Sequence, residues 1–444
     1  MTIVVAPEPK VCVVGIWHLG AVTAACLADL GYAVVGVEED VGKVQNLNKG
    51  IPPLFEPDLP EMMAQNIAAG RLTFAARLAE GLAGASYVLI TYDTPLDDND
   101  DVDVSGILAI AGELGPRLED GATIIVSSQV PVGTCEEMAA VVRQANPSLR
   151  FGIAYVPENL RLGQAIQGFK QPEMMVIGAD SEATLRRVEQ LLAPIQAPRV
   201  RVDLRTAEMT KHAINAYLAT SITFANEIAN LCDEVGADAL KVAEALRLDS
   251  RIGPGAPLRP GLGFAGGTLA RDLKVLRRLS ERHGYQASLI NAVLAVNERQ
   301  NDVVVGRLRR VLGSFDGRSV GILGLTYKAG TSTLRRSAAL GIIRTIVAEG
   351  AVVKAHDPKA NPNELCLHDG FTFCDNPYAV AQGSDALVLV TNWPQFRELD
   401  YPRIGSLMRN PVILDALNML DADHMVEAGF RYIGVGRGCR DNAT

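Results

Sequence analysis

Two separate stretches of the chain alternate short apolar runs with segments of helical periodicity, and this pattern is the strongest constraint on the fold. In the first stretch the apolar runs are 11–14, 33–37, 87–90, 123–126 and 151–155. In the second stretch they are 319–323, 352–356, 386–390 and 412–414. Strands that alternate with helices form a parallel sheet covered by helices on both faces. The sequence therefore predicts two doubly wound α/β domains.

A helical region separates the two alternating stretches. Its first helix is expected to begin near Thr206, and no Gly or Pro interrupts the chain until Gly236. This helix is longer than an average globular helix, so we expect it to join domains and to support a homodimer. The predicted division is an N-terminal α/β domain over 1–200, a central helical and dimerisation domain over 201–312, and a C-terminal α/β domain over 313–444.

Composition and charge exclude several kinds of partner. The net charge of −9 disfavours nucleic acid, because binding to its phosphates needs a basic face. No segment supplies the ~18 uninterrupted apolar residues of a membrane span. The seven cysteines form no CxxC pair, which argues against a disulfide framework and a metal site and favours a reducing, cytoplasmic location. The acidic run Asp97–Asp103 is expected to be a solvated loop.

The first strand-to-helix turn reads Gly15-Ile-Trp17-His-Leu-Gly20, and Glu38 ends the second strand. These positions and spacings are typical of a dinucleotide-binding turn, in which the helix N-terminus faces a pyrophosphate. A carboxylate at Glu38 favours NAD over NADP, because it repels a 2′-phosphate. Trp17 replaces the middle glycine, so a packing turn without a cofactor stays an alternative. If NAD binds, we expect the Trp17 ring to turn outwards.

Several motifs in the same order over nearly the whole chain resemble the nucleotide-sugar 6-dehydrogenases, which oxidise UDP-glucose, GDP-mannose and related sugars. The most specific is the stretch 260–272, Pro-Gly-Leu-Gly-Phe-Ala-Gly-Gly-Thr-Leu-Ala-Arg-Asp. Others are 47–57, 127–134, 155–160, 249–253, 324–328 and 391–396. The resemblance implies two Rossmann-like domains joined by a helical central domain. It also implies NAD as the cofactor and a nucleotide-linked sugar as the substrate.

The resemblance assigns residues to both ligands. Those expected to contact the cofactor are Gly15, Trp17, Leu19, Gly20, Glu38, Thr94, Gln129 and Arg335. Those expected to contact the substrate are Glu158, Asn159, Leu160, Lys211, Asn215, Arg251, Gly261, Phe264, Gly266, Tyr327 and Lys328. In the family the arginine matching Arg251 often reaches across a dimer interface.

The expected catalytic residues are Lys211, Asn215, Glu158, Asp272 and Thr268. Lys211 and Asn215 stand four residues apart and therefore project from one helix face. In the family these two positions contact the oxygen on the reacting carbon and the catalytic water. Glu158, or a water bound to Asp272, is expected to relay the hydroxyl proton.

Thr268 stands where the family has a cysteine, and this difference determines the expected product. The first oxidation of a CH2OH group needs no thiol. In the second, a thiolate adds to the aldehyde, and a threonine has no comparable alkoxide population. We therefore predict a single two-electron oxidation. Two alternatives stay open: a full four-electron oxidation through a hydrated aldehyde, giving a uronic acid, and a non-catalytic protein that binds nucleotide sugars.

Simpler structural roles compete with the catalytic ones. Thr268 is expected to be the N-cap of the following helix rather than a nucleophile. Glu158 has an alternative role as a helix cap, and Asp272 one as a first-turn carboxylate. A lysine such as Lys211 is usually solvated, and His212 is expected to be structural because it points away from Lys211.

Three further positions differ from the family pattern. Gln129 occupies the place of a threonine, and Arg271 that of a lysine. Leu417 stands where the family often has an arginine, which removes one possible contact to an anion.

Overall fold

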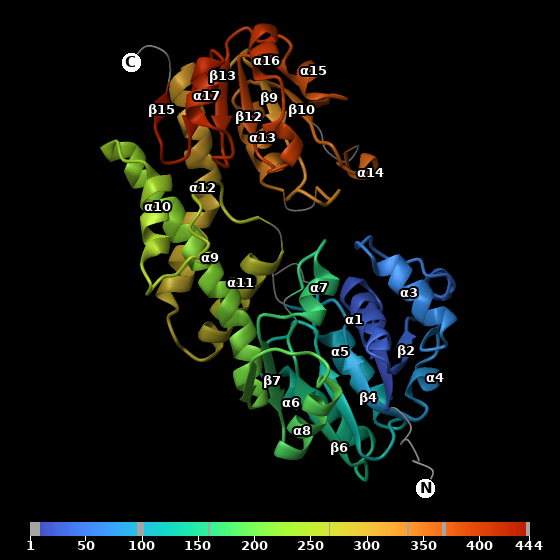
Figure 1. The fold of residues 1–444 in the computed structure, drawn as a ribbon. Helices are drawn as coiled ribbons and strands as arrows, with labels where there is room; N and C mark the ends of the chain where they lie inside the picture. The colour runs from blue at the N-terminus through green and yellow to red at the C-terminus, as the bar shows by residue number, and fades with distance from the viewer. Residues whose placement is uncertain are drawn as a thin grey trace. The chain divides into compact units, whose positions relative to one another are not determined.

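The structure is a computed structural model that describes residues 9–95, 102–158, 160–265, 267–334, 337–365 and 370–440. The chain divides into two compact units, Met1–Ala213 and Ile214–Thr444 (Figure 1). Most of the acidic run 97–103 lies outside the described residues, as do three expected site residues, Asn159, Gly266 and Arg335. None of the helices in the described ranges combines the length and apolar character that a membrane span requires.

The first unit contains an eight-stranded sheet in the order β3-β2-β1-β4-β5-β6-β7-β8. The strands are β1 (Lys10–Val14), β2 (Ala33–Val37), β3 (Leu72–Ala75), β4 (Ala85–Ile90), β5 (Ala122–Val126), β6 (Phe151–Tyr155), β7 (Met175–Ala179) and β8 (Arg199–Val202). The helices are α1 (His18–Asp29), α2 (Val41–Leu47), α3 (Leu59–Ala68), α4 (Leu78–Leu82), α5 (Ser105–Leu114), α6 (Thr134–Ala145), α7 (Ala165–Lys170) and α8 (Glu182–Leu191). Neighbouring strands are parallel except for the β6–β7 pair.

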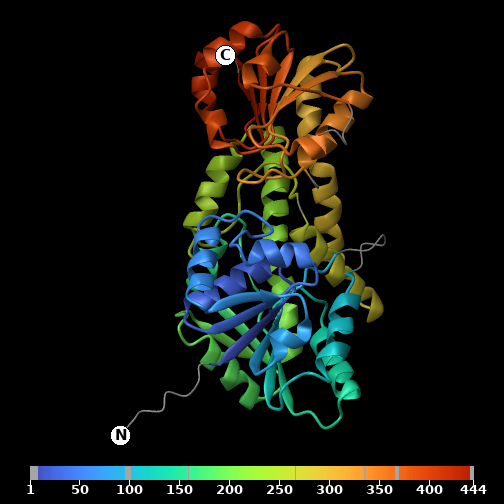
Figure 2. The same ribbon diagram turned by 90° about the vertical axis from the view of Figure 1, so that its right-hand side faces the viewer.

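Both faces of this sheet are covered, and β1 shows why. Val11 and Val13 belong to one buried core, together with side chains of α1, α3 and α8. Cys12 and Val14 belong to another, together with side chains of α4, α5 and α6. Successive residues of a strand point to opposite faces, so a continuous apolar strand needs helices on both (Figures 1 and 2). The predicted doubly wound arrangement is confirmed.

The second unit begins within a long helix and ends in a seven-stranded sheet of order β11-β10-β9-β12-β13-β14-β15. The helices that precede the sheet in the chain are α9 (Leu204–Val235), α10 (Ala239–Leu248), α11 (Thr268–Arg282) and α12 (Ser288–Leu312). The strands are β9 (Ser319–Leu323), β10 (Val352–His356), β11 (Thr372–Phe373), β12 (Ala386–Leu389), β13 (Val412–Asp415), β14 (Arg431–Gly434) and β15 (Cys439–Arg440). The helices that alternate with these strands are α13 (Ala338–Ala348), α14 (Pro362–Leu365), α15 (Pro377–Ala381), η1 (Pro394–Arg397), α16 (Tyr401–Leu407) and α17 (Ala422–Glu427).

This sheet is also parallel, apart from the terminal β14–β15 pair. It is covered on both faces by separate apolar cores. The long uninterrupted helix and the second α/β sheet predicted from the sequence are both confirmed.

Each sheet contains one point at which the strand order reverses. In the first sheet the chain leaves β1 towards β2 and later returns to place β4 on the other side of β1. In the second sheet β9 has the same position between β10 and β12. At each reversal, the loops that follow the two adjacent strands, β1 and β4 or β9 and β12, run in opposite directions. They leave a crevice at the carboxyl edge of the sheet, where open α/β sheets bind ligands.

Candidate active site

In the turn after β1, two glycines allow backbone segments to pack closely against each other. Gly15 has φ +94°, which favours glycine, and its N–H donates to the Val37 carbonyl at 3.1 Å. A Cβ on Gly20 would lie 2.2 Å from the Gly15 carbonyl oxygen and 2.8 Å from Thr91 Oγ1. Both glycines are therefore required where the N-terminus of α1 meets the loop after β4. This cradle fits the pyrophosphate of a dinucleotide.

Trp17 does not distort this turn. It is the N-cap of α1, with extended backbone angles (φ −102°, ψ −152°) that any residue adopts, and its side chain is 45 % exposed. The next residue, His18, pairs through Nε2 with the buried Glu56 carboxylate at 2.8 Å. Glu56 also accepts the N–H groups of Gly163 and Ala165, at 2.9 and 2.8 Å. Sequence reasoning missed this link between the turn and the 163–165 loop.

Other expected cofactor residues lie at the same edge of the first sheet. Glu38 directly follows β2, and its Oε1 lies 3.4 Å from Lys43 Nζ. The Thr94 hydroxyl, after β4, donates to the Gln129 carbonyl, after β5, at 2.6 Å. The structure thus brings Thr94 and Gln129 together, and Glu38 supplies the carboxylate expected beside an adenosine ribose.

Lys211 contacts the segment that carries Glu158. Its Nζ donates to the Glu158 carbonyl oxygen at 2.5 Å, and the lysine is only 5 % exposed. The alternative of a solvated lysine is therefore wrong. The Glu158 carboxylate accepts the Leu160 N–H at 2.5 Å. The alternative of a helix cap is also wrong, because the next helix begins only at Ala165.

His212, the neighbour of Lys211, is buried, and its Nε2 lies 2.9 Å from the Val130 carbonyl. Its ring therefore holds the backbone after β5, which agrees with the structural role expected for it.

In the second unit, the Asn215 side-chain amide donates to the Asp272 carboxylate, and both side chains are buried. Asp272 lies in the second turn of α11, and no acidic residue occupies the first turn. The alternative of a first-turn carboxylate is therefore wrong. The Asn215 amide fixes the orientation of the buried Asp272 carboxylate.

Thr268 is the first residue of α11, and Gly267 is the N-cap. The expected capping role of the Thr268 hydroxyl is wrong, because the helix begins one residue earlier than that role requires. No side chain caps this helix, and Thr268 is exposed. The position is thus the accessible N-terminal end of a fifteen-residue helix.

Amide side chains hold the loop before α11. Asn226 of α9 accepts the Gly261 N–H at 2.8 Å and donates to the Leu262 carbonyl at 3.0 Å. The contacts from α12 are Gln300 to the Gly261 carbonyl (2.8 Å), Asn297 to the Phe264 N–H (2.7 Å) and Asn301 to the Gly263 N–H (3.1 Å). These residues were not expected from the sequence, although 297, 300 and 301 share one helix face. They fix a loop that has no secondary structure of its own.

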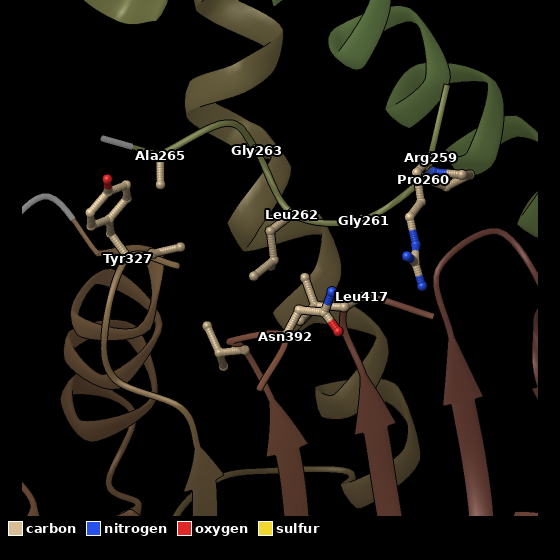
Figure 3. Close-up of a pocket in the computed structure, with 11 residues that line it drawn as sticks. Arg259, Pro260, Gly261, Leu262, Gly263, Ala265, Tyr327, Asn392 and Leu417 are labelled. Carbon is tan, nitrogen blue, oxygen red and sulfur yellow. The ribbon is translucent and has the colours of Figure 1, made fainter. Parts of the chain in front are cut away.

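This loop lines one side of a cavity of about 220 Å³ (Figure 3). The other side comes from the carboxyl edge of the second sheet, with Tyr327 after β9, Asn392 after β12 and Leu417 after β13. Two expected substrate residues, Gly261 and Tyr327, therefore line the same cavity. Arg259 also lines it and donates to the Asn418 carbonyl at 3.0 Å. Sequence reasoning did not single out Arg259.

The remaining expected substrate residues have other surroundings. Lys328 Nζ lies 5.6 Å from the centre of the Tyr327 ring, next to the cavity. Phe264 packs against a small core between α9, α11 and α12, and Leu160 packs against the core of the first unit. Arg251 is exposed and forms an ion pair with Asp249 at 2.6 Å. The structure does not bring Arg251 to the cavity.

Five cysteines have described side chains, and none of the five has the properties of a nucleophile. Burial raises the pKa of the Cys12 and Cys26 thiols to about 12. Burial also raises the pKa of Cys135, Cys232 and Cys374 above the usual range. A reactive cysteine needs a lowered pKa. These five thiols therefore offer no substitute for a cysteine at 268.

All three regions of the chain match domains of one known protein family. Residues 9–196 match the NAD-binding domain of the UDP-glucose/GDP-mannose dehydrogenase family, 205–299 its central domain, and 321–422 its UDP-binding domain. A UDP-glucose 6-dehydrogenase of Pseudomonas aeruginosa is 37 % identical over 442 residues, which cover 96 % of this chain and 97 % of that protein. The UDP-glucose 6-dehydrogenase TuaD of Bacillus subtilis is 35 % identical, with 96 % and 93 % covered.

Solved structures agree with this similarity. The structure of a UDP-glucose dehydrogenase from the archaeon Pyrobaculum islandicum superimposes with a TM-score of 0.88 at 32 % identity, covering 97 % of this chain and 98 % of that one. The match extends over both α/β sheets and the helical region between them.

Proposed function

Because the chain belongs to the UDP-glucose/GDP-mannose dehydrogenase family, we propose that this NAD-dependent nucleotide-sugar dehydrogenase oxidises a UDP-linked sugar by a single hydride transfer. One observation carries the proposal: the exposed first residue of α11 is Thr268, at the position where the resemblance to the family implies a cysteine. The buried groups proposed for the first oxidation, Lys211, Asn215 and Asp272, make defined polar contacts.

Each polar group has a separate task in this reaction. The Lys211 ammonium stabilises the oxygen of the reacting carbon as its proton leaves. The Asp272 carboxylate, held by Asn215, receives that proton through a water. Glu158 is the less suitable base here, because its carboxylate already accepts the Leu160 N–H. NAD, when bound at the glycine turn after β1, supplies the hydride acceptor.

The aldehyde is the proposed product, because Thr268 does not support the second oxidation. A thiol at this position would have a thiolate fraction near neutral pH, but an aliphatic hydroxyl does not. The methyl group of threonine also adds bulk beside the reacting carbon. The pKa of all five described thiols is raised, so none of them replaces the missing nucleophile.

The cavity between the 259–265 loop and the second sheet is the proposed nucleotide site. Arg259 lines it and brings positive charge, which suits a diphosphate, and Lys328 Nζ lies 5.6 Å from the ring centre of Tyr327, another lining residue. Tyr327, Leu262 and Leu417 bring apolar surface, which suits a base or ribose. Leu417 supplies no charge, so Arg259 is the arginine proposed to contact the phosphates.

We keep the proposed domain boundaries at 1–200, 201–312 and 313–444. The three family matches, 9–196, 205–299 and 321–422, each fall inside one of these ranges.

The stoichiometry of NADH tests the proposed product. We expect one NADH for each UDP-glucose consumed at completion, and a product two hydrogen atoms lighter than the substrate by mass spectrometry. Two NADH per sugar and a uronic acid would show that a hydrated aldehyde donates a second hydride without a covalent intermediate. UDP binding without NAD binding in calorimetry would support a non-catalytic role.

A homodimer through α9 is the proposed assembly. Exposed apolar side chains recur along one face of this helix at Tyr217, Phe224, Leu231 and Val235. The first three are about two helical turns apart, and Val235 follows about one turn later. They form a continuous stripe, which is typical of an interface with another helix. The same stripe on a second copy is the surface that it fits, because a twofold interface is self-complementary.

Charges placed in this stripe are expected to separate the dimer. The double variant Phe224→Asp, Leu231→Asp would bury two carboxylates at the interface, and light scattering is expected to report a monomer. Tyr285→Asp is the control, because Tyr285 is a more exposed aromatic residue that lies outside α9. A dimer in both variants would contradict this interface.

A further inference from the structure

A buried ion pair lies at the centre of a polar network in the second unit. Arg307 of α12 and Asp233 of α9 are joined by an Nη2–Oδ2 contact of 2.6 Å, and their side chains are only 6 % and 9 % exposed. The same Arg307 Nη2 donates to Asn230 Oδ1 at 2.6 Å. Neither charged residue lines the cavity.

On one side, the network reaches the proposed nucleotide site. The Asn230 amide donates to Gln300 Oε1 at 3.0 Å, and the Gln300 amide donates to the Gly261 carbonyl at 2.8 Å. Gly261 belongs to the loop that lines the cavity. Arg307 is therefore two side chains away from this wall.

On the other side, the network holds the turn after β14. Asp233 accepts the Gly436 N–H at 3.2 Å and the Gly438 N–H at 2.8 Å. Within this turn Val435 exchanges two hydrogen bonds with the Asn418 side chain, at 2.9 and 2.8 Å. The backbone of Asn418 in turn holds Arg259.

The contacts therefore close into a ring, because Arg259 donates to the Asn418 carbonyl and stands two residues before Gly261. This ring connects both walls of the cavity. Gly261 belongs to the loop wall, and Leu417, which precedes Asn418, belongs to the sheet wall. Within the ring Arg307 makes both of its printed contacts through Nη2, while its Nε and Nη1 are buried without a hydrogen-bond partner among the described residues. The ring of hydrogen bonds nevertheless couples the positions of its members.

We propose that Arg307 is a positioning residue for the nucleotide, which sets the distance between the 259–265 loop and the loop after β13. The inference rests on the proposed function in one respect, that this cavity takes the UDP part of the substrate. Arg307 has no contact with the reacting atoms. Its loss should weaken nucleotide binding and leave cofactor binding unchanged.

The test is Arg307→Met in the full chain, with UDP and NAD titrated separately by calorimetry. We expect the Kd for UDP to rise ~10- to 100-fold, because a misplaced 259–265 loop would weaken its contacts with the nucleotide, and each tenfold rise in Kd corresponds to a loss of only ~1.4 kcal/mol. The Kd for NAD should stay within twofold. KM for the nucleotide sugar should rise by a similar factor, with kcat changed much less. Arg307→Lys, which keeps the charge, should recover part of the affinity for UDP.

Arg310→Met is the matched control, since Arg310 lies on the same helix, is exposed and has a partner 3.7 Å away in Glu234. It should bind UDP like the wild type. If Arg307→Met does not fold, Asn230→Ala breaks the relay and leaves the ion pair intact, and it should also weaken UDP binding.

Wild-type affinity for UDP in folded Arg307→Met or in Asn230→Ala would overturn the inference. Equal losses of UDP and NAD affinity would also overturn it, because they would indicate a general structural role. If the wild type itself binds no UDP, the proposed substrate is wrong instead.

Discussion

Thr268→Cys is expected to change the reaction from one NADH per sugar to two, and the product from an aldehyde to a uronic acid. The new thiol stands at the N-terminus of the fifteen-residue α11. The partial positive charge of a helix N-terminus stabilises a thiolate and lowers its pKa. The thiolate adds to the aldehyde carbon, a second hydride leaves to NAD, and water releases the acid from the thioester. NADH absorbance and product mass at completion measure the change.

Thr268→Ser is the matched control. It keeps a hydroxyl but removes the methyl group, so it separates crowding from nucleophilicity. We expect it to give one NADH per sugar, at a rate equal to or above that of the wild type. One NADH per sugar from Thr268→Cys, with UDP and NAD bound normally, would refute the idea that residue 268 alone limits the product. Alkylation by iodoacetamide would show whether the new thiol is reactive.

The sequence predicted most of the fold because the central strands are buried on both faces. Such strands read as nearly continuous apolar runs, as in 124–126 and 412–414. The strands at the sheet edges were missed for the opposite reason. Residues 199–202 read Arg-Val-Arg-Val and are half exposed, and 372–373 is too short to give a pattern. Only pairing with a neighbouring strand defines these elements.

The site was predictable only in part. Motif resemblance located Lys211, Asn215 and Asp272 along the chain, but not the contacts that bury them. Thr268 was assigned the cap of α11, yet Gly267 has that position, because a helix start is defined by backbone geometry to within a residue or two at best. Arg307 carries no local signal, since its partner Asp233 lies 74 positions earlier on another helix.

Lys211→Met is expected to lower the rate of hydride transfer by ~10²- to 10³-fold, which is the usual effect of removing one donor to a developing oxyanion. Methionine keeps most of the length and apolar volume of the lysine side chain, so the packing around α9 should persist. The loss should appear in kcat, because the ammonium acts most strongly on the charge that develops in the transition state. Single-turnover NADH formation by stopped flow measures this step directly.

The buried Lys211 also donates to the Glu158 carbonyl at 2.5 Å. The loss of its charge must therefore be distinguished from a displacement of the backbone at Glu158. Lys241→Met is the control for loss of one lysine, because Lys241 is exposed and pairs with Glu244 at the surface. It should keep the wild-type rate. A positioning role for Lys211 would raise KM with kcat unchanged, and that result would remove the lysine from the chemical step. A fall in kcat with unchanged Kd for NAD and UDP would instead place the Lys211 ammonium beside the reacting oxygen. Such a result indicates an interaction that forms only in the transition state, because neither ground-state affinity changes.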